Sequence, residues 1–183
     1  GQPATGLRLT PRGRFMARMP VDPRLSRMLL EAREQGCLDE MLVIAAALSI
    51  QDPRERPLDR AAQADQAHAA FKDPMSDFVG FLNIWQAALR AQEERKGAGG
   101  LKRFCREGYL SFRRLREWRD VHQQLAAVAA EAGLEAAAER RPENGGRANA
   151  AFSPLYAAIH RAVLSGFLAN IAQRREKNLY RAA

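Results

Sequence analysis

The residues whose types and spacing could do chemistry lie together in one basic and aromatic segment, from Leu101 to Arg119. This segment holds seven cations and two carboxylates, and four aromatic side chains are interleaved with them. The guanidinium group of arginine binds phosphate oxygens through two parallel hydrogen bonds. The segment therefore indicates a binding site for phosphate groups.

A helix predicted to begin with Ser111 as its N-cap would order these cations in space. Along it, Arg113, Arg116 and Arg119 recur at intervals of three and form a ridge beside the apolar stripe, and Arg114 flanks that ridge. The unpaired N–H groups at the start of a helix, together with the positive end of its macrodipole, also attract phosphate. The predicted binding residues are Arg103, Arg106, Ser111, Arg113, Arg114, Arg116 and Arg119.

The same arginines also have a structural interpretation, which the local sequence leaves open. They could pair with acidic residues such as Glu107, Glu117 and those of the acidic stretch 35–100, while the aromatic rings fill the core. A second functional interpretation is a basic adaptor module that docks an acidic protein partner on this helical face. Binding to a membrane surface is disfavoured, because Trp85 and Trp118 lie in apolar stripes that a helical bundle would bury.

The rest of the sequence offers no pattern typical of catalysis, cofactor binding or metal binding. It lacks a Gly-x-x-x-x-Gly-Lys-Ser/Thr loop, and its three histidines lie on different predicted helices without Cys or His partners at metal-ligand spacing. Cys37 and Cys105 have no recognisable base beside them, so we interpret both as small buried hydrophobic residues. We therefore expect no catalytic residue, metal ion or cofactor in this chain.

The composition favours a folded, basic protein of a reducing compartment. Of 183 residues 46% are hydrophobic, and Lys plus Arg outnumber Asp plus Glu by 29 to 21, which gives a formal net charge of +8. Such a charge favours polyanionic partners. Two distant cysteines argue against a disulfide framework, and no apolar run reaches the ~18 residues of a membrane span, so we expect a cytoplasmic location. The first residues, Gly-Gln-Pro-Ala-Thr-Gly, indicate a boundary inside a longer protein.

Start and stop signals divide most of the sequence into helices. Thr10-Pro11 and Asp22-Pro23 each place a capping side chain before a proline at the first helical position, and Gly36 offers a left-handed stop. No longer segment shows the period of two that a half-buried strand requires, so the predicted fold is all-α, a multi-helix bundle with the apolar stretch 38–50 at its centre. The predicted helices cover 12–19, 23–35, 38–50, 59–71, 76–94, 101–107, 111–132 and a last long helix over 154–171. The predicted inward stripe of 76–94 is Phe78, Phe81, Leu82, Trp85 and Leu89. The last helix carries small residues that permit close approach to a neighbour, namely Ala162, Ser165, Gly166 and Ala169.

Several segments, in order along the chain, carry a family resemblance. They are 9–17, 19–30, 38–49, Asp73-Pro74-Met75-Ser76-Asp77-Phe78, 81–85, and Phe104-Cys105 with 109–113. Together they resemble the region that follows the two motor domains in DEAH-box helicases, with most similarity to the bacterial HrpA type of ATP-dependent RNA helicase.

The resemblance implies a division of the chain into two domains. Residues 1–35 would form the C-terminal part of a winged-helix domain. Residues 36–178 would form the helical ratchet, or helicase-associated, domain, with a flexible linker near 135–150. Residues 179–183 would begin the following segment.

The resemblance also implies a function. In such helicases the motor domains use ATP and Mg²⁺ to move along RNA, while the winged-helix and ratchet domains close over the channel. The chain would then be a non-catalytic accessory region and a monomer, which holds single-stranded RNA, or DNA, by its backbone beside the motor domains of the same polypeptide. The family's channel contacts come from the start of the helix that matches 111–125, which gives Arg113, Arg114 and Arg116. Many relatives carry small hydroxyl residues where Arg114 and Arg116 stand.

Overall fold

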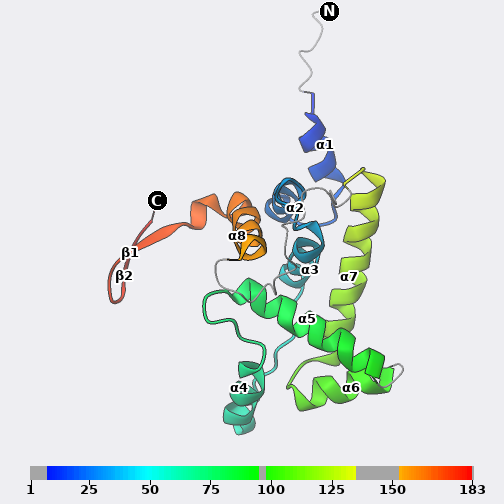
Figure 1. Cartoon of the computed structure of the whole chain (residues 1–183), viewed down its shortest axis with the longest axis vertical. Coiled ribbons are helices and arrows are strands. Elements are labelled where there is room, and N and C mark those ends of the chain that lie inside the picture. The colour runs from blue at the N-terminus through cyan, green and yellow to red at the C-terminus, as the bar shows by residue number, and fades with distance from the viewer. Residues whose placement is uncertain (1–7, 95–97, 135–152, 183) are drawn as a thin grey trace, which may run out of the picture.

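The chain forms a bundle of α-helices followed by a small β-hairpin (Figure 1). This computed structural model describes residues 8–94, 98–134 and 153–182. The predicted all-α fold class is confirmed. The elements are α1 (Pro11–Arg18), α2 (Pro23–Gln35), α3 (Leu38–Leu48), the 3₁₀ helix η1 (Leu58–Arg60), α4 (Ala61–Ala69), α5 (Asp77–Glu94), α6 (Ala98–Glu107), α7 (Phe112–Glu131), α8 (Pro154–Gly166), the 3₁₀ helix η3 (Leu168–Asn170), β1 (Ala172–Glu176) and β2 (Leu179–Ala182).

The first two helices begin and end where their side-chain signals predict. Thr10 Oγ1 accepts a hydrogen bond from Gly13 N at 3.0 Å, and Asp22 Oδ1 accepts one from Arg24 N at 2.8 Å. Gly36 ends α2 in the left-handed conformation, at φ 71°, which a residue without a Cβ adopts at little cost. These caps set where α1 begins and where α2 begins and ends.

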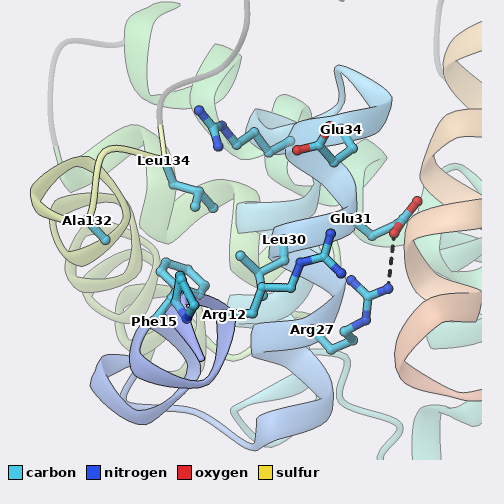
Figure 2. Close-up of a pocket in the computed structure, with 10 residues that line it drawn as sticks. Arg12, Phe15, Arg27, Leu30, Glu31, Glu34, Ala132 and Leu134 are labelled. Carbon is cyan, nitrogen blue, oxygen red and sulfur yellow. Dashed lines mark hydrogen bonds and ion pairs between the residues drawn. The ribbon is translucent and has the colours of Figure 1, made fainter. Parts of the chain in front are cut away.

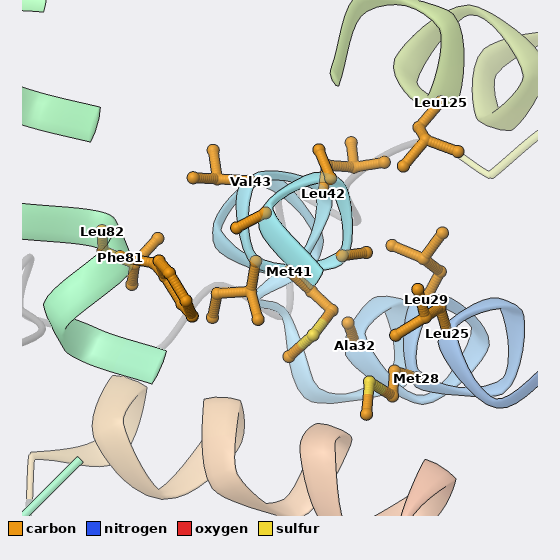
Figure 3. Close-up of a cluster of buried hydrophobic side chains, with 14 of the residues drawn as sticks. Leu25, Met28, Leu29, Ala32, Met41, Leu42, Val43, Phe81, Leu82 and Leu125 are labelled. Atoms are coloured by element: carbon orange, nitrogen blue, oxygen red, sulfur yellow. The ribbon is translucent and has the colours of Figure 1, made fainter. Parts of the chain in front are cut away.

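Helix α3 lies at the centre of the bundle, as predicted. Its side chains are buried without interruption from Met41 to Ala47. Helices α2, α5, α7 and α8 all contact it, and Figure 3 shows apolar side chains such as Met28 of α2, Phe81 of α5 and Leu125 of α7 gathered around it. Burying one large apolar side chain stabilises a fold by about 1.5–3 kcal/mol. This cluster is therefore the main source of stability.

Trp118 anchors α7 against α3 and α5. Its side chain is fully buried, and its Nε1 donates a hydrogen bond to Val43 O of α3 at 2.9 Å. Its ring also packs on Trp85 and Phe81 of α5, with centroid distances of 5.2 and 5.9 Å. Because one face of α7 is fixed in this way, its polar face points away from the core.

Helix α8 packs along α2 at a close approach. A Cβ atom added at Gly166 would stand 2.6 Å from the carbonyl oxygen of Arg24 and 2.8 Å from Met28 Cγ. Ala162, one turn earlier, is fully buried. The close approach that the small residues of this segment predict is therefore confirmed for Gly166.

The C-terminal end differs from the sequence-based expectation. Helix α8 ends at Gly166, and an antiparallel hairpin of β1 and β2 follows η3, with Arg174 opposite Tyr180. The prediction of a helix that reaches residue 171 is wrong. Every residue of both strands is exposed, so the strands have no apolar face that would have produced a period of two. In Figure 1 the hairpin extends away from the helices.

The domain boundaries remain predictions. Residues 135–150, where the linker is predicted, lie outside the described residues.

Candidate nucleic-acid interface

The start of α7, where the predicted cations lie, is clamped by an extended segment that follows α3. Arg54 forms an antiparallel β-bridge with Leu110. Glu55 N donates a hydrogen bond to Tyr109 O, and Ser111 N donates one to Pro53 O, both at 2.8 Å. These backbone contacts fix the direction in which α7 leaves the turn before it.

Tyr109 is the strained residue of this clamp. Its φ of 50° lies in the left-handed region, which residues other than glycine rarely adopt. Nε2 of the buried His68 lies 3.0 Å from the Tyr109 carbonyl oxygen. Because a carbonyl only accepts hydrogen bonds, this Nε2 carries the proton, and His68 ties α4 to the turn that precedes α7.

The first turn of α7 has neither a side-chain cap nor an acidic residue. Ser111 occupies the N-cap position predicted for it, but its hydroxyl forms no capping hydrogen bond. The N–H groups of the first turn therefore receive no side-chain cap from Ser111, and the first turn holds no carboxylate of its own to offset the positive end of the helix macrodipole. This end of α7 suits an anion.

Arg113 and Arg116 project from the beginning of α7 into solvent. Both side chains are exposed, and their spacing of three residues puts them on one face of the helix. Glu117 and Asp120 stand four residues after them, yet neither guanidinium group has an ion pair or hydrogen bond with another described residue. Arg106 of α6 is exposed and, among the described residues, equally without a partner.

Arg114 and Arg119 are half-buried and engaged with the protein itself. Arg114 Nη1 donates to the backbone oxygen of Asp52 at 3.1 Å, and Arg119 Nη1 donates to Gln92 Oε1 at 2.5 Å. The Asp52 carboxylate is held by Arg54 at 2.6 Å. Burial raises the pKa of Asp52, but hydrogen bonds from Arg54 outweigh burial and leave this pKa below its usual value. Arg114 and Arg119 therefore position α7 in addition to adding positive charge.

Two cations of α6 differ in their surroundings. Arg103 Nε lies 2.5 Å from Glu107 Oε1 in an exposed pair of the helical i,i+4 kind, so the predicted pairing of these arginines with acidic neighbours is confirmed for Arg103. Lys102 Nζ lies 5.6 Å from the centre of the Phe112 ring. Lys102 is exposed and absent from the predicted binding residues, although its place in the same basic run is the signal that would have included it.

Comparison with known families gives this arrangement a context. A family model described as "Helicase associated domain (HA2), ratchet-like" matches residues 22–156, which is most of the chain. The chain belongs to this helicase-associated, ratchet-like family. The basic start of α7 is thus a feature of a ratchet-like domain, and the resemblance to a ratchet domain is confirmed.

Individual relatives are helicases many times longer than this chain. The ATP-dependent RNA helicase HrpA of Escherichia coli (strain K12) is 42% identical over 171 residues, 93% of this chain and 12% of that protein. An HrpA homolog of Haemophilus influenzae is 40% identical over 176 residues, 96% of this chain and again 12% of the relative. The pre-mRNA-splicing factor ATP-dependent RNA helicase prp22 of Schizosaccharomyces pombe is 36% identical over 119 residues, which are 64% of this chain and 9% of the prp22 protein. The resemblance to DEAH-box helicases of the HrpA type is confirmed.

The two thiols of this ratchet-like domain are buried. Burial raises the pKa of Cys37 to about 12 and that of Cys105 to about 11, so both thiols stay protonated at neutral pH. Their interpretation as small hydrophobic residues is confirmed by their exposures of 0% and 2%.

Metal-ligand clusters and membrane-spanning helices are both absent from the described part of this domain. Across 8–94, 98–134 and 153–182, there is no group of three or more His, Cys, Asp or Glu side chains that could hold a metal ion. None of the helices in these ranges is long and apolar enough to cross a membrane.

Proposed function

We propose that this chain guides RNA as an accessory region of an ATP-dependent DEAH-box RNA helicase. In this proposal it holds single-stranded RNA by its phosphate backbone and performs no chemistry itself. Motor domains of the same polypeptide hydrolyse ATP with Mg²⁺, in the cytoplasm. The names of the bacterial relatives, both ATP-dependent RNA helicases, support the activity of the whole protein.

The observation that carries the RNA-binding proposal is the state of Arg113 and Arg116. Both are exposed at the uncapped start of α7, on one face, and neither is neutralised by a carboxylate among the described residues. A guanidinium group that is already paired would lose that partner on binding phosphate, whereas these two lose only water. They are therefore the first candidates for phosphate contacts.

The surroundings of this pair support a site that is fixed before RNA arrives. The β-bridge at Arg54 and the bonds to the Tyr109 carbonyl hold the start of α7, and Trp118 holds its inner face. A site that needs little reordering loses little conformational entropy on binding. Arg106 and Lys102 of α6 extend the positive surface beyond α7.

The predicted role is backbone holding without sequence preference. Phosphate contacts supply affinity and position, and sequence is read by contacts to base edges. The cations at the start of α7 are suited to the first task. We therefore expect similar affinity for uridine-rich and adenosine-rich single strands, and single-stranded DNA is a second ligand to compare.

Fluorescence anisotropy with a labelled single-stranded RNA tests the proposal. The variant Arg113→Ala/Arg116→Ala should weaken binding by about tenfold or more at low salt, since a hydrogen bond to a charged group contributes about 1.5–3 kcal/mol. Arg24→Ala/Arg181→Ala removes the same charge from exposed positions elsewhere and is the matched control. Equal affinity in the two double variants would reject Arg113 and Arg116 as the site.

The alternative is a basic adaptor module that binds an acidic protein through the same arginines. Pull-down with and without ribonuclease distinguishes the two functions. A complex that survives digestion and requires Arg113 and Arg116 would favour the adaptor function, whereas a complex lost on digestion supports RNA guiding.

A further inference from the structure

A groove at the far end of α7 has no part in the proposed RNA site. It lies between α1, α2 and the residues that follow α7, and its volume is about 210 Å³ (Figure 2). Helix α7 contains 20 residues and rises ~1.5 Å per residue, so the groove is ~30 Å from the helix start. The groove and the start of α7 can therefore hold different ligands at the same time.

The walls of the groove are apolar at depth. Phe15 of α1 and Leu134 are buried, at 6% and 7% exposure, and Leu30 of α2 and Ala132 are half-buried. These side chains face one another across the groove in Figure 2. The space is large enough for one large apolar side chain and too small for a folded surface.

The rim of the groove is positively charged. Arg12 of α1 and Arg33 of α2 line it and are exposed, and neither has an ion pair among the described residues. A smaller hollow beside it is lined by the exposed Arg14 and Arg18. Of these two, Arg14 donates to the backbone oxygen of Leu9 at 2.9 Å, a neutral acceptor that does not offset a positive charge.

Carboxylates on one wall decide which kind of anion fits. Glu31 and Glu34 of α2 also line the groove. Glu31 pairs with Arg27 at 3.3 Å and accepts a hydrogen bond from Gln35 at 2.9 Å, so it is already satisfied. An RNA strand carries a charge at every nucleotide and would bring phosphates against these carboxylates. A peptide can place its acidic residues at Arg12 and Arg33 alone.

We propose that this groove binds a short acidic segment of a protein partner, which inserts one large apolar side chain between Phe15, Leu30 and Leu134. Carboxylates on either side of that side chain pair with Arg12 and Arg33. An apolar anchor in a pocket with arginines at its edge is the arrangement that dominates binding energy in many protein interfaces. The proposal does not depend on RNA binding at α7, and it uses different arginines.

The test uses the 183-residue chain and a fluorescein-labelled synthetic peptide with one Leu-Phe pair flanked on both sides by Glu. We expect saturable binding, weakened about tenfold by Arg12→Ala/Arg33→Ala, since arginine is among the residues whose truncation most often weakens an interface. Arg24→Ala, also exposed on α2, should bind as the unchanged chain does. A peptide with Gln in place of Glu, and one with Ala in place of Leu and Phe, should each bind more weakly.

Two outcomes would overturn the proposal. One is the absence of peptide binding, or equal binding by the Arg12→Ala/Arg33→Ala variant and the Arg24→Ala control. The other outcome concerns RNA binding, which is measured by titrating the same variants with a labelled uridine oligonucleotide. If removing Arg12 and Arg33 weakens RNA binding and leaves peptide binding unchanged, the groove is an RNA surface. RNA binding that depends on Arg113 and Arg116 and not on Arg12 and Arg33 keeps the two sites separate.

Discussion

Replacing Gly166 by alanine sets helix propensity against packing, and the structure decides between them. Alanine is a better helix former than glycine by up to about 1 kcal/mol, so propensity alone predicts a more stable protein. The added Cβ would stand 2.6 Å from the Arg24 carbonyl oxygen and 2.8 Å from Met28 Cγ. Met28 can shift, but the oxygen belongs to the backbone of α2, so α8 must move away from α2.

The size of the effect follows from these two terms. Forcing an extra methyl group into a packed core costs about 1–3 kcal/mol, which exceeds the gain in propensity. We expect Gly166→Ala to lower the free energy of unfolding by about 1–2 kcal/mol and the Tm by roughly 2–8 °C. Gly99→Ala is the control, because nothing lies within 4 Å of its added Cβ, and its Tm should equal or exceed that of the unchanged chain. A Tm for Gly166→Ala at or above the unchanged value would refute the packing of α8 on α2 described here.

Three further predictions concern the elements that position α7. Trp118→Phe removes the donor to Val43 O and part of a buried ring, so urea denaturation should show a loss of about 1–3 kcal/mol, and an unchanged midpoint would argue against this anchor. His68→Ala removes the bond from α4 to Tyr109 O, and only Ala64 and His68 are buried in α4. Amide exchange should therefore accelerate in α4 while α3 stays protected, and His68→Gln should restore part of the protection. Burial raises the pKa of Cys37 from 9.0 to about 12 and that of Cys105 from 9.0 to about 11. As the pH rises above 9, the folded protein therefore keeps thiol protons that the unfolded chain has released. The contribution of the two thiols to the free energy of unfolding is full below pH 9 and falls as the pH rises towards 11. The Cys37→Ala/Cys105→Ala variant should therefore show a smaller fall in the free energy of unfolding over this range.

The helices whose boundaries carry local signals could be predicted from sequence. Asp22-Pro23 and Gly36 bound α2 through contacts within a few residues, so the sequence alone contains the cause. Continuous apolar residues likewise predict that α3 is enclosed, because no polar face is left to meet water. The hairpin could not be predicted in this way, since β1 and β2 are exposed on both faces and one of them reads Ala-Gln-Arg-Arg-Glu.

The inward face of α5 was predicted only in part. Phe81 is buried, but Leu89, expected in the same stripe, is 39% exposed, and Ala88 is buried in its place. A stripe predicted from large apolar residues leaves out alanine, so the burial of Ala88 was not predicted. Which of two adjacent residues faces the core depends on where α6 lies across α5, and this is a tertiary contact.

The candidate site was predicted as a region, and the roles within it came from the structure. Spacing placed Arg113 and Arg116 on one face, which local helix geometry determines. The engagement of Arg114 with the Asp52 backbone joins residues far apart in sequence, and no local pattern indicates it. The same holds for Arg119 and Gln92. The sequence therefore identified the cations but could not separate those that face solvent from those that position the helix.

The salt dependence of RNA binding measures the central claim most directly. The logarithm of the association constant is plotted against the logarithm of salt concentration for the unchanged chain and for Arg113→Ala/Arg116→Ala. If each arginine neutralises one phosphate, the slope should become less steep by about 0.7–1 per arginine, or about 1.4–2 for the pair. The Arg24→Ala/Arg181→Ala control should keep the original slope. Parallel lines for the unchanged chain and the Arg113→Ala/Arg116→Ala variant would contradict the assignment of these two side chains to RNA phosphates.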